Sequence, residues 1–326
     1  MMRTGLYVLI LLATLFCIRV QSQNVALSRL KSPILFHGDE NTAYRDPAVL
    51  FHNGTFYLFF TLVETEKDGM IYMYTATSKS TDLVTWSSPV KLTVKNQNLN
   101  FSSPGNIIRF GDEWLLCLQT YPRPGCRAKQ PIVYGNKDAR LFIMHSTDLE
   151  NWSQPELLKV KGPDVPVDDM GRMIDPYLLE DKDEPGKYWC FYKQNGVSMS
   201  FTRDLKTWTF SGHTVSGENT CVIIENNQYL LFHSPANGIG IKKSNDLVTW
   251  TDWGNLITLG QTGWEWAKGR ITAGAVVKLE GNSLAKYLMF FHGSGPLTEK
   301  LGDFDKNASI GIAWSNDLTN WDWPAK

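Results

Sequence analysis

A seven-residue pattern, Ser/Thr-x-Asp-Leu-x-x-Trp, occurs five times along the chain. Its aspartates are Asp82, Asp148, Asp204, Asp246 and Asp317, and its tryptophans are Trp86, Trp152, Trp208, Trp250 and Trp321. Successive copies are 42 to 71 residues apart, a spacing typical of propeller blades that carry loop insertions. The pattern therefore predicts five copies of one supersecondary unit.

Each copy of the pattern closes a longer unit with a constant order. An apolar strand such as PAVLFHNG (47–54) is followed by a turn rich in Gly, Asn and Asp, and then by an aromatic strand such as FYLFFTLV (56–63). A third strand leads into the Asp-Leu-x-x-Trp turn, and the tryptophan opens a short outer strand. Hairpin units that repeat radially leave few open strand edges. We predict an all-β five-bladed β-propeller with four antiparallel strands per blade, in which the aspartate stabilises its turn and the tryptophan packs between blades.

The N-terminus resembles an export signal. Arg3 precedes an apolar run from Leu6 to Val20, and small or polar residues follow before Gln23. We predict a signal peptide over 1–22, a single propeller domain over 23–326, and an exported protein, periplasmic or extracellular. A lipid anchor at Cys17 is disfavoured by bulky residues before it, and no second apolar run predicts a transmembrane span.

Net charge and cysteine content limit which partners and cofactors we expect. The formal net charge is -1 and the sequence pI is about 6.6, so no basic field favours nucleic acid. Four cysteines follow the signal, which permits two disulfides or buried free thiols. They are Cys117, Cys126, Cys190 and Cys221. No pair has metal-ligand spacing, so we expect no metal cofactor, although converging acidic groups leave room for a structural cation in the channel.

Carboxylates stand at three of the five blade entrances. The first strand of each propeller blade lines the central channel, so residues at its start face one shared cavity. The carboxylates there are Asp46, Asp175 and Glu218, from blades one, three and four. Cleavage of an acetal needs one carboxylic acid at the leaving oxygen and a second carboxylate on the opposite side, about 6.5 to 9.5 Å away in inverting enzymes. A third carboxylate can raise the pKa of the acid. This set predicts glycoside chemistry.

On these residues the chain resembles the five-bladed propeller hydrolases of glycoside hydrolase family 43 and its relatives, including family 117. The resemblance implies that Asp46, in Asp46-Pro47, is the general base, and that Asp175, in Asp175-Pro176, tunes and orients the acid. It implies that Glu218 is the general acid. The family usually has Glu-Gly-Pro at this place, whereas this chain has Glu218-Asn219-Thr220. Glu265, in Trp264-Glu265-Trp266, is a rival acid. Where the family often places a blade-five histidine, the nearest polar candidate here is Arg270.

Other side chains near the predicted cavity are candidates for substrate binding. They are Arg45, Arg172, Arg270, His233, Trp264 and Trp266. Each has a structural alternative, because the arginines can neutralise the aspartates, the histidine can be a structural donor, and the tryptophans can belong to a packed loop.

Three functions fit these features. The first is an inverting, exo-acting glycosidase that removes a terminal sugar, with an arabinofuranoside suggested by the resemblance and a xyloside or galactoside also compatible. The second is a glycoside phosphorylase, for which Arg45, Arg172, Lys193 and Arg270 would supply a basic cluster. The third is a catalytically inactive glycan-binding propeller. All three predict a carbohydrate partner.

Overall fold

The computed structural model describes residues 27–324 apart from 136, 280–284 and 296–303. The predicted signal peptide, 1–22, and Cys17 lie outside the described residues. Within them no helix is both long enough and apolar enough to cross a bilayer.

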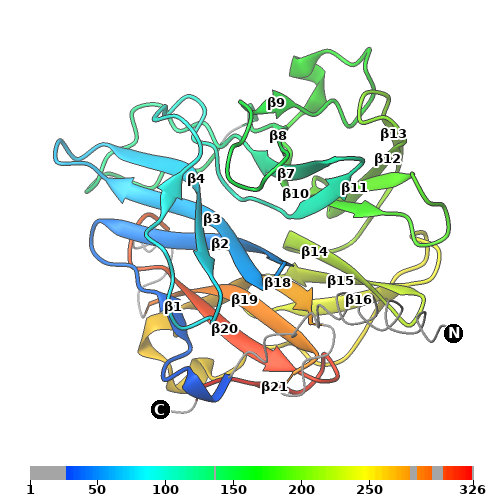
Figure 1. The fold of residues 1–326 in the computed structure, drawn as a ribbon. Coiled ribbons are helices and arrows are strands. Elements are labelled where there is room, and N and C mark those ends of the chain that lie inside the picture. The colour runs from blue at the N-terminus through cyan, green and yellow to red at the C-terminus, as the bar shows by residue number, and fades with distance from the viewer. Residues whose placement is uncertain (1–26, 136, 280–284, 296–303, 325–326) are drawn as a thin grey trace, which may run out of the picture.

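The strands form five antiparallel sheets in chain order, arranged around a common centre (Figure 1). We call them blades 1 to 5. Blade 1 contains β2(Thr42–His52), β3(Thr55–Thr65), β4(Ile71–Ser80) and β5(Val90–Lys91). Blade 2 contains β6(Ile107–Phe110), β7(Glu113–Gln119), β8(Leu141–Ser146) and β9(Glu156–Leu157). Blade 3 contains β10(Ile174–Glu180), β11(Tyr188–Lys193), β12(Val197–Thr202) and β13(Thr209–Thr214). Blade 4 contains β14(Glu218–Glu225), β15(Gln228–Ser234), β16(Gly240–Ser244) and β17(Thr251–Asp252). Blade 5 contains β18(Arg270–Lys278), β19(Tyr287–Ser294), β20(Ser309–Ser315) and β21(Trp321–Asp322). The predicted five-bladed β-propeller is confirmed.

The ring is closed by joining the two ends of the described chain in one sheet. The N-terminal strand β1(Ile34–Phe36) pairs antiparallel with β20, which also pairs with β21 (Figure 1). The backbone N–H of Ile312 donates to the carbonyl oxygen of Pro33 at 2.8 Å, which extends this pairing. Blade 5 therefore holds segments from both ends, and opening the ring would break these strand hydrogen bonds.

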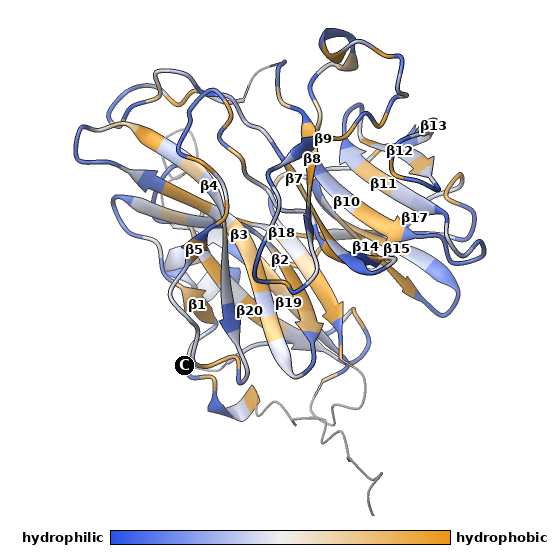
Figure 2. Cartoon of the chain, turned by 45° about the horizontal axis from the view of Figure 1, so that its top comes forward, coloured by the Kyte–Doolittle hydropathy of each residue, from blue (hydrophilic) through white to orange (hydrophobic). Residues whose placement is uncertain are grey.

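The core lies between the blades. Each of the five blade interfaces contains one cluster of buried apolar side chains, and a sixth cluster lies between blades 1 and 2 and the 304–308 segment. Apolar side chains accordingly follow the strands, whereas polar residues dominate the connecting loops (Figure 2). Because both faces of a blade are covered by its neighbours, its strands read as continuous apolar runs and carry little alternation.

The repeated turn has one conformation in all five copies. The aspartate Oδ1 accepts backbone N–H bonds from the residues two and three positions ahead, and the tryptophan Nε1–H donates to the carbonyl oxygen of the turn leucine at 2.9 to 3.3 Å. Each turn leucine has a left-handed φ between 60 and 68°. Each tryptophan packs in the cluster shared with the preceding blade, as Trp152 does against Phe59 of blade 1, with ring centroids 5.5 Å apart. The structural role predicted for both residues is confirmed.

The four cysteines of the described chain are buried free thiols, so the alternative of two disulfides is not realised here. No group of three His, Cys, Asp or Glu side chains that could hold a metal ion occurs among the described residues.

Candidate active site

The chain changes direction at one equivalent residue at the start of each blade, within the first strand in blades 1, 3, 4 and 5 and just before it in blade 2. These residues have left-handed φ angles between 41 and 55° although none is glycine; they are Asp46, Ser103, Asp175, Asn219 and Ala273. The pairing register shifts at this point in blades 1, 3, 4 and 5, which is the signature of a β-bulge. Such φ angles are unfavourable for residues with a side chain and concentrate at functional sites. All five residues meet at the propeller axis, where they line a space of about 20 Å³.

A larger cavity of about 200 Å³ lies next to this point. Its walls include all three predicted carboxylates, Asp46, Asp175 and Glu218. The fold thus brings together side chains that are up to 172 residues apart in the sequence. Three of the predicted substrate-binding residues, Arg45, Arg172 and Arg270, line the same cavity.

Asp46, in β2 of blade 1, lies in the wall of the cavity and is buried. Its Oδ2 accepts hydrogen bonds from Thr61 Oγ1 at 2.9 Å and from Ser103 Oγ at 3.1 Å. Burial raises the pKa of this carboxyl, but the charge of Arg45 and the contacts with His292 and Thr61 outweigh burial and hold the pKa well below its usual range. Asp46 is therefore a carboxylate at neutral pH.

The pKa of Asp175 is shifted in the opposite direction from that of Asp46. Asp175 is buried, and its Oδ2 accepts the backbone N–H of Asn219 at 3.0 Å. Burial and the negative charges of Glu218 and Asp46 raise its pKa to about 7, against the smaller opposing effects of that hydrogen bond and of Arg172. Two aspartates at equivalent bulges thus differ in protonation near neutral pH, because only Asp46 has a buried cation and hydroxyl donors around it.

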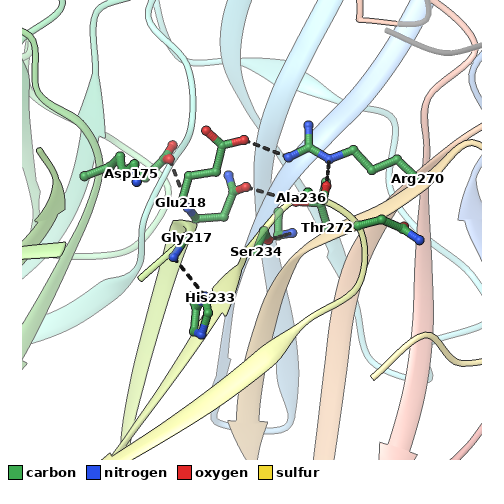
Figure 3. A network of polar contacts seen from close by, with 12 residues as sticks. Asp175, Gly217, Glu218, His233, Ser234, Ala236, Arg270 and Thr272 are labelled. Carbon is green, nitrogen blue, oxygen red and sulfur yellow. Dashed lines mark hydrogen bonds and ion pairs between the residues drawn. The ribbon is translucent and has the colours of Figure 1, made fainter. Parts of the chain in front are cut away.

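Glu218 is the first residue of β14, and its side chain is 37% exposed, the most accessible of the three carboxylates. Its Oε1 forms an ion pair of 2.7 Å with Nη2 of Arg270 (Figure 3). Arg270 is itself fixed by a 2.8 Å hydrogen bond from Nε to the carbonyl oxygen of Ala236. The pair sets the direction of the Glu218 carboxyl and leaves Oε2 as the oxygen that can meet a ligand.

The other two arginines have different surroundings. Arg45 is buried, donates from Nη1 to the carbonyl oxygen of Phe304 at 3.0 Å, and stacks 3.8 Å from the centroid of that ring. Arg172 is exposed, and its guanidinium lies 6.0 Å from the ring of Tyr121. Arg45 is thus an electrostatic partner of Asp46, and Arg172 is the arginine open to a ligand.

An aromatic wall that the sequence did not reveal completes the cavity. Tyr121, Tyr134 and Phe304 all line it, and Phe304 contacts both tyrosines. The neighbouring Asp305 is held by Arg123 through two short contacts of 2.6 and 2.7 Å, a bidentate pair that anchors this segment. These residues come from loops outside the repeat, so the spacing of the repeat gave no signal for them.

Five predicted residues lie elsewhere. Trp264 and Trp266 stack on each other with centroids 5.3 Å apart and pack in the cluster between blades 4 and 5, so they are a packed loop and form no platform at the cavity. Glu265, the rival acid, is exposed, pairs with Lys268 at 2.9 Å, and is not among the residues of the cavity wall. His233 lines a different, adjoining cavity, as does Lys193.

Asn219 and His292 are further residues of the site. Asn219 lies at the cavity and contacts both aspartates, while His292 Nδ1 accepts the backbone N–H of Asp46 at 3.2 Å. The signal for Asn219 was its position beside Glu218, in the place of the glycine expected from the resemblance. Asparagine tolerates the left-handed φ of 55° found there better than most residues do.

The fold and the site define an all-β protein of the five-bladed propeller class with three carboxylates converging at its axis. This is the fold of the glycoside hydrolases of families 43 and 62, as comparison with solved structures shows. A thermostable family-43 glycoside hydrolase matches with a TM-score of 0.58 and 13% identity, over 88% of this chain and 95% of that chain. The catalytic domain of a family-62 α-L-arabinofuranosidase from Coprinopsis cinerea matches with a TM-score of 0.59 and 15% identity, over 85% and 96%. An exo-1,5-α-L-arabinanase from a bovine ruminal metagenomic library matches with a TM-score of 0.52 and 15% identity, over 84% and 93%. No protein-family profile and no curated protein sequence matches the chain.

Proposed function

We propose that this protein is an exported, inverting glycoside hydrolase that removes a terminal sugar from an oligosaccharide or polysaccharide. The observation that carries the proposal is the meeting of Asp46, Asp175 and Glu218, from three different blades, in one cavity. The fold shared with families 43 and 62 supports it, and residues 1–22 support export.

In the proposed mechanism Asp46 activates water. It is ionised, buried and held by Thr61 and Ser103, so it can accept a proton without changing its position. Glu218 protonates the leaving oxygen through Oε2 while Arg270 fixes Oε1. Asp175, whose pKa is raised to about 7 by burial and by the charges of Glu218 and Asp46, exchanges a proton near neutral pH beside the other two carboxylates.

The substrate class follows from the size and lining of the cavity. About 200 Å³ suits one sugar ring, which favours removal of a terminal residue. The aromatic wall of Tyr121, Tyr134 and Phe304 offers apolar faces for the sugar C–H groups. Matched structures include an arabinofuranosidase and an exo-arabinanase, so an arabinofuranoside is the first sugar to test, followed by a xyloside and a galactoside.

A phosphorylase is the second candidate, because Arg45, Arg172 and Arg270 all line the cavity. Two of them are already engaged, Arg45 by Phe304 and Arg270 by Glu218 and Ala236. A phosphate ion would therefore be left with Arg172 as its accessible guanidinium, which favours water as the nucleophile.

The test is hydrolysis of a panel of 4-nitrophenyl glycosides by the mature protein in phosphate-free buffer, beside Glu218→Gln. Release of 4-nitrophenol by the wild type, with loss in the variant, would support a glycosidase. Turnover that requires added phosphate would replace it with the phosphorylase. Sugar binding without turnover on any glycoside of the panel, with or without phosphate, would favour the binding propeller.

A further inference from the structure

A second cavity, of about 400 Å³, adjoins the catalytic cavity at Glu218. Glu218 is the one residue that the described walls of both cavities share. Every strand of blade 4 contributes to the second cavity, from the innermost to the outermost; the contributions are Glu218 from β14, His233 from β15, Lys242 from β16 and Asp252 from β17. Lys193 and residues 215–217 border it from the blade 3 side. We call this cavity the blade-4 groove.

The described lining of the blade-4 groove combines two ammonium groups, Lys193 and Lys242, with two carboxylates, Asp252 and Glu218. The Lys193 ammonium reaches the carbonyl oxygen of Ser216 at 3.2 Å, and the Lys242 ammonium lies 2.6 Å from Asp252 Oδ1. The Asp252 side chain is 83% exposed and the Lys242 side chain only 14%, so the carboxylate is hydrated while the ammonium stays in the groove. The charge of Glu218 at the inner end is already balanced by Arg270. With these two pairs balanced, the ammonium of Lys193 is the cation of the described lining that has no carboxylate partner, so the groove has a net charge of about +1 at its blade 3 side.

His233 adds a neutral donor between the two lysines and Glu218. Its Nδ1 accepts the backbone N–H of Gly217 at 3.0 Å, which assigns the ring proton to Nε2 (Figure 3). Burial and the charges of Lys242 and Lys193 lower its pKa to about 4 against the opposing charge of Asp252, so the ring is uncharged at neutral pH. Two ammonium groups and a fixed imidazole N–H form a combination that suits an anionic group on a ligand.

The position of Glu218 assigns the groove a place in the reaction. A general acid contacts the glycosidic oxygen, so the bond to be cleaved must lie beside Glu218, where the two cavities meet. The terminal sugar then occupies the central cavity and the departing part of the substrate occupies the groove. We propose that the blade-4 groove is the leaving-group site and selects a glycan whose departing sugar carries a carboxylate or a sulfate. This inference rests on the proposed function.

The test is a comparison of binding by calorimetry, using trigalacturonic acid, a sulfated galactotriose and neutral galactotriose as probes. The wild type should bind the better of the two anionic trimers at least about tenfold more tightly than the neutral one, since hydrogen bonds to charged groups are the stronger kind. The double variant Lys193→Met/Lys242→Met should lose that preference. Lys243→Met is the matched control, because Lys243 is the next residue in β16 and therefore points to the opposite face. The two anionic probes decide whether carboxylate or sulfate is preferred.

Equal wild-type binding of the anionic and neutral trimers would overturn the proposal, and so would an unchanged preference in a folded double variant. If the double variant does not fold, the same comparison is made with the single variants Lys193→Met and Lys242→Met. Failure of the groove is distinguishable from failure of the proposed function. An anionic preference that depends on the two lysines, without hydrolysis of any aryl glycoside, would leave the groove as a glycan site on a non-catalytic protein. Hydrolysis without the anionic preference would support the glycosidase and contradict the proposal that the groove selects an anionic leaving group.

Discussion

Asn219 contacts both aspartates of the site. Its backbone N–H donates to Asp175 Oδ2 at 3.0 Å, and its side-chain Nδ2 lies 3.5 Å from Asp46 Oδ1. Thr272 Oγ1 donates to Asn219 Oδ1 at 3.1 Å, which fixes the orientation of the amide. The backbone contact depends on the left-handed φ of 55°, and the side-chain contacts depend on the amide. Substitutions can therefore separate the two roles.

Asn219→Gly should leave the stability almost unchanged and lower the turnover several-fold. Glycine adopts the left-handed conformation without strain, so the hydrogen bond to Asp175 survives while the amide near Asp46 is lost. Asn219→Ala should lose the amide as well and in addition destabilise the fold by about 1 kcal/mol, because Cβ disfavours this φ. Urea unfolding and kcat of both variants measure this. Equal stability of the two variants would show that the φ angle carries no cost.

Asp46→Asn should lower kcat by about 10²- to 10⁴-fold, the usual contribution of a general base. The amide keeps the shape of the side chain and can still accept from Thr61, so the fold should persist. The measurement is turnover on the best aryl glycoside, with thermal unfolding as the control for folding. Near-normal turnover in a folded variant would remove Asp46 from the mechanism.

The repeat made the architecture predictable, because each copy marks one turn with a fixed hydrogen-bond pattern and one tryptophan at a blade interface. The first-strand starts then located Asp46 and Asp175 at equivalent positions, and Glu218 one residue before the equivalent Asn219, because these strand starts surround one axis. The wall residues Tyr121, Tyr134 and Phe304 escaped prediction because they belong to loops that differ from blade to blade. Trp264 and Trp266 were misplaced for a related reason: an aromatic pair in a loop has the same sequence signature whether it faces a sugar or a core.

Glu218→Gln should show a strong dependence on the leaving group. A general acid matters most when the departing oxygen is basic, so the variant should lose about 10²- to 10⁴-fold on an alkyl or sugar leaving group. On a 2,4-dinitrophenyl glycoside, whose leaving group needs no proton, most of the activity should return. The measurement is kcat on both substrates for wild type and variant. An equal loss on both would assign Glu218 a role other than proton donation.

Asp175→Asn should change how stability depends on pH between about 4 and 7. The folded-state pKa of Asp175 is raised to about 7, above the unfolded value of 3.8, so its contribution to stability is fully present below pH 4 and is lost as the pH rises through 7. At about 1.4 kcal/mol per unit, the wild type should lose up to about 4 kcal/mol relative to the variant across this window.

The low pKa of Asp46 also makes stability depend on pH, but with the opposite sign and over a lower pH range. Its stabilising effect is present above its unfolded value of 3.8 and is lost only as the pH falls below that value, so it does not mask the effect of Asp175. Urea unfolding of wild type and Asp175→Asn at pH 4, 5.5 and 7.5 measures the difference, with Asp168→Asn, an exposed aspartate of the 3-10 helix η2(Val167–Met170), as a matched control. Parallel stability curves for the wild type and Asp175→Asn would show that Asp175 titrates at its ordinary pKa. Asp175 would then be ionised at neutral pH, and Glu218 would have an ionised carboxylate beside it instead of a partly protonated one.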